Sequence, residues 1–252
     1  MSTGTGSLWH NGILSFYDRG TSERVLPLAP VTFYDDFLGA YLQKYTAAEN
    51  TTALWKTVET NLNTAIGLSA DVVNGAAALI LDSDDNAEVA CLHFGDNECL
   101  SLKQGLIFEA RVTFSTLPTT GTETVQAVLG LAGDHNTDLD TIDVGAWFRV
   151  ESAANTALLW ETDDDSVNDD DNATGITLVA GTYNIFRIDA TDIAAVKFYV
   201  DGELVGTAVM SGLTTTTCKV QPYFNVSKAK TTANTGTGTM IVDYIRAWQK
   251  RS

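Results

Sequence analysis

The sequence predicts an all-β protein, built as a sandwich or barrel of short antiparallel strands. Runs that alternate apolar and polar side chains recur along the chain, and clusters of turn-forming residues separate them. Thr, Val, Ala, Gly, Asp and Asn dominate, while proline is rare, with 4 in 252 residues. Helical periodicity is absent except in the segment 37–45, which could as well be a loop.

The alternating runs define the expected strands in chain order. In the segment 106–115, Phe108, Ala110 and Val112 fall on one face and Glu109 and Arg111 on the other. One face is therefore core, and the other faces water or the edge of a second sheet. The expected strands are 54–59, 77–81, 89–94, 106–115, 124–131, 144–151, 157–162, 182–190, 196–200, 203–209, 218–226 and 239–249.

Two segments near the C-terminus carry the clearest strand signals. Asp201-Gly202 joins two alternating runs, which is a strong hairpin signal. The segment 238–249 alternates through Ile241, Asp243 and Ile245. It is therefore expected to be a strand that closes a sheet rather than a tail.

These segments resemble the end of a concanavalin A-like jelly roll, the fold of lectins, glucanases and laminin-G-like domains. In such domains a hairpin of the type "fyvDG" is followed by a final strand of the type "vDYirvw". The sequence Phe-Tyr-Asp-Asp-Phe at 33–37 is similar to their opening strand, so the resemblance covers about 33–249. It implies a two-sheet antiparallel jelly-roll sandwich over residues 31–252, in a superfamily that holds both sugar-cleaving enzymes and binding or structural modules.

Residues 1–30 fall outside the resemblance and are expected to form an N-terminal extended arm. An apolar segment left free in water would be an aggregation hazard, so the arm packs either on its own sandwich or on a neighbouring subunit. Its candidate partner-binding residues are Leu8, Trp9, Ile13, Leu14, Phe16 and Tyr17.

The charge of the chain restricts its partners. Fifteen Lys and Arg against 32 acidic residues give a formal net charge of −17, which argues against binding nucleic acid. Met1 is not followed by a basic segment and an apolar core, and no apolar run approaches the length of a membrane span. We therefore expect a soluble protein made in a cytoplasm and not secreted.

Three cysteines, Cys91, Cys99 and Cys218, lack the Cys-x-x-Cys spacing of zinc or redox sites. They are expected to be small buried or half-buried thiols, although Cys91 and Cys99 could pair across neighbouring strands.

Hydrolytic chemistry is poorly supported by motifs. Jelly-roll glucanases carry Glu-x-Asp-x-Glu or Glu-x-Asp-x-x-Glu on one strand, where alternation directs all three carboxylates to one face. Here Glu161 and Asp163 share a face, but the third carboxylate on that face, Asp165, stands at the start of what we interpret as a loop, which continues through the acidic segment 166–175. A solvated acidic hairpin is favoured over a hydrolase site.

Other catalytic arrangements are also unsupported. His10, His93 and His135 are the only histidines, and no Gly-x-Ser-x-Gly motif, phosphate loop or dinucleotide fingerprint accompanies them. The sequence therefore predicts a protein that is not an enzyme and needs no cofactor.

One acidic loop has the spacing of a cation site. Oxygen-bearing side chains stand at every second position, at Asp134, Asn136, Asp138 and Asp140, as in the first half of a calcium loop. The glycine and the bidentate glutamate of that loop are missing, so Ca²⁺ is a candidate ligand on spacing alone.

Sugar binding needs an aromatic platform with polar groups on an exposed face. The aromatic candidates are Trp55, Trp147, Trp160, Tyr199 and Tyr223, each in an expected strand where a core role is commoner. Because Phe148 follows Trp147, one of these two rings must point away from the core.

An acidic jelly roll opened by an aromatic arm also resembles the capsid-associated decoration proteins of tailed bacteriophages. This resemblance implies a virion protein on the capsid surface, bound to a major capsid protein and assembled as a homo-oligomer. Surface glycans are a further candidate partner for such a protein. A carbohydrate-binding module is the alternative function, and a divergent glycosidase ranks third.

Overall fold

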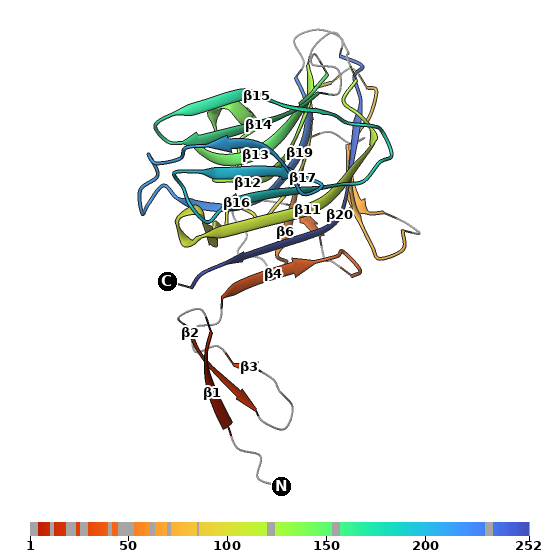
Figure 1. The fold of residues 1–252 in the computed structure, drawn as a ribbon. Helices are drawn as coiled ribbons and strands as arrows, with labels where there is room; N and C mark the ends of the chain where they lie inside the picture. The colour runs from red at the N-terminus through yellow and green to blue at the C-terminus, as the bar shows by residue number, and fades with distance from the viewer. Residues whose placement is uncertain are drawn as a thin grey trace.

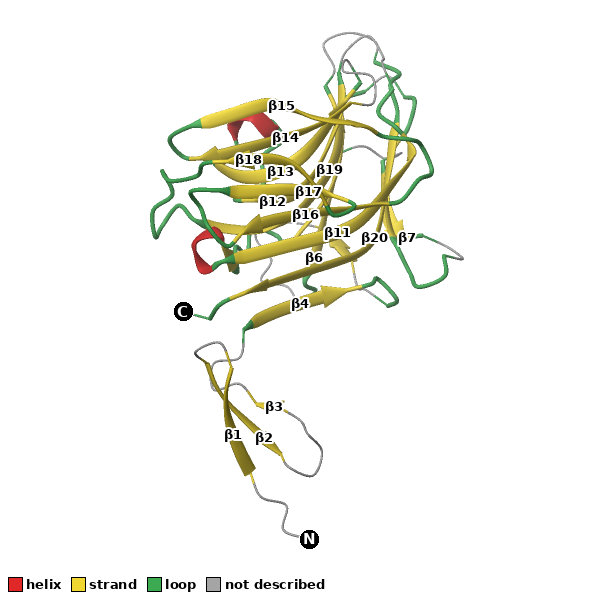
Figure 2. Ribbon diagram, in the orientation of Figure 1, coloured by secondary structure: helices red, strands yellow, loops and turns green. Residues whose placement is uncertain are grey.

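The computed structural model describes residues 5–10, 13–18, 24–25, 30–39, 42–44, 53–60, 64–69, 72–84, 86–119, 124–152, 157–229 and 234–251. In these ranges the chain forms two large sheets and one small sheet (Figures 1 and 2). The helical elements described are two 3-10 turns, η1 (Leu102–Gln104) and η2 (Leu139–Thr141). The predicted all-β sandwich is confirmed. No helix of the described ranges is long and apolar enough to cross a membrane.

The first large sheet, the β12 sheet, has nine strands in the order β15-β14-β13-β12-β19-β9-β6-β5, with β10 paired to β19 outside this path. Its pairs are antiparallel except for β5 with β6. The strands are β5 (Leu42–Lys44), β6 (Trp55–Glu59), β9 (Glu88–His93), β10 (Leu100–Ser101), β12 (Val125–Ala132), β13 (Val144–Glu151), β14 (Ala157–Asp164), β15 (Asn168–Thr177) and β19 (Lys219–Lys228).

The second large sheet, the β11 sheet, has eight strands in the order β18-β17-β16-β11-β20-β8-β7, with β4 also paired to β20. All its pairs are antiparallel. The strands are β4 (Val31–Asp35), β7 (Ala65–Leu68), β8 (Ala77–Leu81), β11 (Leu106–Thr116), β16 (Asn184–Ala190), β17 (Val196–Val200), β18 (Glu203–Ala208) and β20 (Gly238–Gln249).

The core lies between the inner faces of the two sheets. Phe148 of β13 packs edge-on against Phe186 and Phe198 of the opposite sheet, with ring centroids 5.2 and 5.4 Å apart. Burying one such side chain stabilises the fold by about 1.5–3 kcal/mol. The alternation predicted for 106–115 is confirmed, because Phe108, Ala110 and Val112 belong to this core.

The two C-terminal signals both form strands of the β11 sheet, the hairpin at its edge and the last strand inside it. Asp201 and Gly202 adopt positive φ angles of 51° and 84° between β17 and β18, as a two-residue hairpin turn of the favoured type requires. β20 pairs with β11, β8 and β4, so the C-terminal strand lies inside the sheet rather than at its edge.

The predicted extended arm contains a small sheet of its own. β1 (Thr5–His10), β2 (Ile13–Asp18) and β3 (Arg24–Val25) pair in that order, and Figure 1 draws them outside the sandwich. The candidate residues Leu8, Trp9, Ile13, Leu14, Phe16 and Tyr17 lie on β1 and β2. Their side chains are outside the described part of the structure, and the domain boundary after residue 30 stays a prediction.

Each strand expected from alternation is present, with ends shifted by a few residues. The interpretation of 166–175 as a loop is wrong, because 168–177 forms β15 against β14. The segment 37–45 is not helical where it is described, since its residues 42–44 form β5. The pairing left open for Cys91 and Cys99 is absent, and both thiols are free.

Candidate functional site

The outer face of the β12 sheet is covered in its middle by residues 133–143, which we call the covering segment. Leu139 and Ile142 of this segment are almost fully buried, at 1% and 3% exposure. They pack on Val128, Trp147 and Tyr223 of the sheet. This apolar contact holds the covering segment on the sheet. Without the segment, this part of the outer face would be an open groove.

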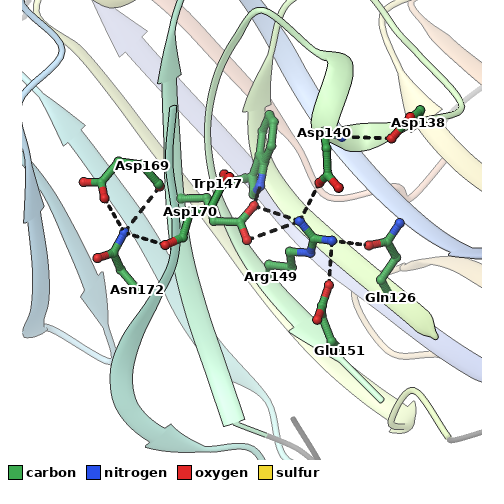
Figure 3. Close-up of polar contacts among 10 residues, drawn as sticks. Gln126, Asp138, Asp140, Trp147, Arg149, Glu151, Asp169, Asp170 and Asn172 are labelled. Atoms are coloured by element: carbon green, nitrogen blue, oxygen red, sulfur yellow. Dashed lines mark hydrogen bonds and ion pairs between the residues drawn. The ribbon is translucent and has the colours of Figure 1, made fainter. Parts of the chain in front are cut away.

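A set of hydrogen-bonded polar side chains around the nearly buried Arg149 lies beside the covering segment (Figure 3). The Arg149 guanidinium donates to Asp140 at 2.8 Å and to Glu161 at 3.3 Å. It also pairs with Glu151 at 2.5 Å and donates to Gln126 at 2.5 Å. We call these residues, together with Trp147, the Arg149 cluster.

Strand alternation positions the Arg149 cluster. Gly145, Trp147, Arg149 and Glu151 point outward from β13, because the intervening Ala146, Phe148 and Val150 belong to the core. Glu161 of β14 lies opposite Trp147 in the register, and the indole nitrogen donates to its carboxylate at 2.7 Å. The expectation that one ring of the pair at 147–148 leaves the core is confirmed.

Burial changes the acidity of this cluster. Burial raises the pKa of Glu161, against the opposing effects of the Arg149 charge and the Trp147 hydrogen bond. Burial alone would lower the pKa of Arg149, but the charges of Glu161 and Glu151 outweigh it and raise that pKa. A carboxyl group with a raised pKa is what general acid catalysis uses, yet Glu161 is only 1% exposed.

The carboxylates of β14 and β15 surround Glu161 without forming a triplet on one strand. Asp163 shares the outward face of β14, and burial raises its pKa. Asp165 lies beyond the end of β14, with a φ of 65°. Asp170 of β15 has a pKa raised by burial and by the charge of Asp140.

Of the four candidate calcium ligands, three form hydrogen bonds or an ion pair within the chain, and the fourth borders a separate cavity. Asn136 accepts the Asp138 N–H at 3.1 Å, and Asp138 accepts the Asp140 N–H at 3.3 Å. Asp140 binds Arg149, while Asp134 borders a separate cavity of about 300 Å³ with Glu98. Within the described ranges, no three His, Cys, Asp or Glu side chains are grouped as metal ligands. The calcium site stays a prediction.

An open cleft remains on the same outer face, next to the covering segment. Its volume is about 460 Å³, and its lining includes Thr60, Val89, Gln126, Asp138 and Ser227. Val89, Ser227 and Gln126 stand side by side on β9, β19 and β12. The Ser227 hydroxyl oxygen is buried and has no hydrogen-bond partner in the structure. We call this the Ser227 cleft.

The predicted aromatic platform is mostly buried. Trp55 and Trp160 belong to the core, while Trp147 and Tyr223 lie beneath the covering segment. Tyr199 is half-buried on the outer face of the β11 sheet. Sequence reasoning missed Ser227 and Gln126, although their outward positions on alternating strands were the signal that could have found them.

No protein-family model matches the sequence, and no curated protein matches it. Several solved structures share its architecture. A putative β-glucanase from Mycobacterium abscessus is 17% identical, with 86% of this chain and 99% of that chain covered at a TM-score of 0.55. The fold is a concanavalin A-like jelly roll.

Two further structures extend this likeness. One, described with endo-acting O-glycanases of the human gut microbiota, is 13% identical over 87% of this chain and 99% of that chain, at a TM-score of 0.55. The other is the carbohydrate recognition domain of Emp47p, 12% identical over 83% of this chain and 95% of that chain, at 0.53. At such identities the likeness shows the fold alone.

The prediction that the chain is not an enzyme is contradicted by these structures, because a putative β-glucanase and an endo-acting O-glycanase share its fold. The absence of three carboxylates on one strand was one of the grounds for that prediction. It does not exclude hydrolysis, since carboxylates on two neighbouring strands also reach one face.

Proposed function

We propose that the chain is a carbohydrate-binding protein that holds a glycan in the Ser227 cleft. The observation that carries this proposal is the Ser227 hydroxyl, which is buried in the cleft wall without a partner. A buried hydroxyl without a hydrogen bond costs about 1–3 kcal/mol. Water does not reach this oxygen in the unliganded protein, so a ligand would bond to it after the Ser227 side chain turns toward the cleft, and the new bond would recover that free energy.

The other groups of the cleft suit a ligand rich in hydroxyls. The Gln126 amide and the Thr60 hydroxyl border the cleft together with the Asp138 carboxylate. Sugar hydroxyls both donate and accept, so such a mixed set can match them. Val89 adds an apolar surface for the C–H face of a sugar ring. The Emp47p carbohydrate recognition domain, which has the same fold, supports this class of ligand.

The test is binding of neutral oligosaccharides on an array, followed by calorimetry with the best ligand. We expect Ser227→Ala to weaken binding by about tenfold, equivalent to about 1.4 kcal/mol, without lowering the melting temperature. The matched control is Thr113→Val, because Thr113 also buries a hydroxyl without a partner, on β11. Equal affinity in Ser227→Ala and wild type would contradict the proposal.

Glycoside hydrolysis is a second candidate function. It is favoured because Glu161 and Asp163 lie on one face of β14 and burial raises the pKa of both carboxyl groups. Glycosidases use two carboxyl groups, one of them a protonated acid. Hydrolysis of a β-glucan panel that disappears in Glu161→Gln and Asp163→Asn would support it. Activity that survives both substitutions would exclude these two acids.

Attachment to a phage capsid is a separate proposal for residues 1–30. It is supported by the sheet β1–β2–β3, which among the described residues pairs only within itself. A homo-oligomer on the surface of the shell, bound to the major capsid protein, is the assembly it implies. Deleting residues 1–30 should abolish binding to assembled capsids and leave glycan binding intact, and retained capsid binding would contradict it.

A further inference from the structure

A second surface with ligand-binding chemistry lies on the outer face of the β11 sheet. Tyr199 of β17 stands opposite Arg187 of β16, which stands opposite Glu109 of β11. Glu109 in turn stands opposite Arg246 of β20, and Arg246 opposite Tyr34 of β4. We call these five residues the tyrosine row. With strands about 4.8 Å apart, it spans on the order of 19 Å across the sheet.

The centre of the tyrosine row is fixed by polar contacts, and its ends are open. Glu109 is nearly buried and pairs with Arg246 at 2.6 Å, while the Tyr244 hydroxyl donates to it at 2.9 Å. Tyr34 is 62% exposed, and the Arg246 side chain is 50% exposed. A depression of about 490 Å³ is lined by four residues of the row, Tyr199, Arg187, Glu109 and Arg246, and Tyr34 lies outside that lining.

Neighbouring side chains hold the Tyr199 and Tyr34 rings in place, although neither ring is part of the core. The Arg187 guanidinium lies 5.5 Å from the centre of the Tyr199 ring. The Tyr34 ring lies 6.3 Å from that of Tyr244. Neither Tyr199 nor Tyr34 belongs to the buried core cluster. Two aromatic rings, the exposed Tyr34 and the half-buried Tyr199, thus stand at the two ends of a line of charged side chains.

This combination matches a sugar chain better than a protein surface. An aromatic ring stacks on the apolar C–H face of a sugar, while guanidinium and carboxylate groups bond neighbouring hydroxyls in pairs. A stable protein interface buries roughly 1,200–2,000 Å² around a centre depleted in charge. The centre of this row is the Glu109–Arg246 ion pair.

We propose that the tyrosine row is a second binding site, which takes a neutral oligosaccharide lying across the strands. Each arginine of the row already pairs with a carboxylate, Arg246 with Glu109 and Arg187 with Asp189. The row therefore offers hydrogen bonds from matched charges, which suits an uncharged ligand better than an ionic one. It lies on the opposite sheet from the Ser227 cleft and does not depend on it.

The experiment is titration of the ¹⁵N-labelled full chain with cellohexaose, xylohexaose and mannohexaose, followed by NMR. We expect at least one hexasaccharide to shift the amide signals of Tyr199, Glu109 and Tyr34. Tyr199→Ala and Tyr34→Ala should each weaken that binding about tenfold. The matched control is Tyr183→Ala, because Tyr183 also lies under an arginine, Arg111 at 4.1 Å, but outside the row.

The result separates the two glycan sites. Ser227→Ala should leave the shifts of the row unchanged, so either site can fail without the other. Shifts confined to the Ser227 cleft, or an equal loss in Tyr183→Ala, would overturn the tyrosine row as a site. Signals of the row that change with protein concentration and with none of the sugars would identify a second copy of the chain as the occupant, and would also overturn it.

Discussion

At the scale of single residues, Arg149 is the most constrained charge on the outer face of the β12 sheet. Its side chain is 9% exposed and that of Glu161 is 1% exposed, so water screens their interaction little. Removing one partner of a buried pair leaves an uncompensated charge, which costs more than removing both. The Arg149 cluster can therefore be tested as a unit.

We expect Arg149→Met to lower the free energy of unfolding by about 3–5 kcal/mol, because Glu161 would stay buried without its cation. The double substitution Arg149→Met with Glu161→Gln should recover much of that loss. Urea unfolding measures both. The control is Arg187→Met, whose partly exposed pair with Asp189 should contribute about 0–1 kcal/mol. A double variant no more stable than Arg149→Met would show that the pair is not coupled.

A second test at this scale concerns Gly145. A Cβ at this position would collide with the Trp147 ring, which lies over the glycine. We expect Gly145→Ala to displace the indole, change its fluorescence and destabilise the fold by about 1–3 kcal/mol. Gly67→Ala is the matched control, because a Cβ there meets nothing within 4 Å. Equal stability of both variants would contradict the close packing.

At the scale of elements, alternation predicted the strands of the sandwich because each needs one buried apolar face. β15 was not predicted from alternation. It is an edge strand, most of whose side chains are exposed or half-buried, so Asp169, Asp170 and Asp171 stand where a central strand needs apolar residues. Charges on an edge strand also discourage pairing with another chain.

The covering segment was unpredictable for a different reason. The spacing of its acidic residues resembles a calcium loop, whereas its contact with the sheet depends on Leu139 and Ile142 meeting Trp147 of the following strand and Tyr223 of the distant strand β19. No local pattern reports such a contact. The Ser227 cleft depends on the same tertiary arrangement, because its rim includes Asp138 of the covering segment.

Acid should loosen the covering segment through His135. Its ring nitrogen Nδ1 lies 2.7 Å from the Tyr223 hydroxyl. Burial and the neighbouring His93 lower the pKa of His135 to about 4, against the opposing charge of Asp96. Between about 4 and the ordinary value near 6.5, the unfolded chain binds more protons, so stability falls as the pH drops through this window.

The measurement compares urea unfolding of wild type and His135→Gln at pH 7 and pH 4.5. We expect wild type to lose more stability on acidification than the variant, because glutamine does not titrate. Carboxyl groups titrate in both proteins, so their effect cancels in the comparison. Equal losses would show that the ring of His135 does not resist protonation in the folded protein.

At the scale of the whole molecule, the net charge of −17 determines how the protein responds to ions. Like charges repel one another in the compact state, and dissolved salt screens them. Any cation therefore stabilises the fold to some extent, and a rise in melting temperature with CaCl₂ is not by itself a sign of a site. The buried core spans both large sheets.

A comparison at matched ionic strength separates screening from binding at Asp134–Asp140. We expect CaCl₂ and NaCl of equal ionic strength to raise the melting temperature similarly, and EDTA to leave it unchanged, because Asn136 and Asp138 cap backbone N–H groups and Asp140 binds Arg149. A bound ion would instead add a concentration-dependent stabilisation through linkage. Asp138→Asn is the control, since it keeps the cap and removes one charge. A rise specific to Ca²⁺ that Asp138→Asn removes would establish the calcium site, and would show that the covering segment gives up its internal contacts to bind the ion.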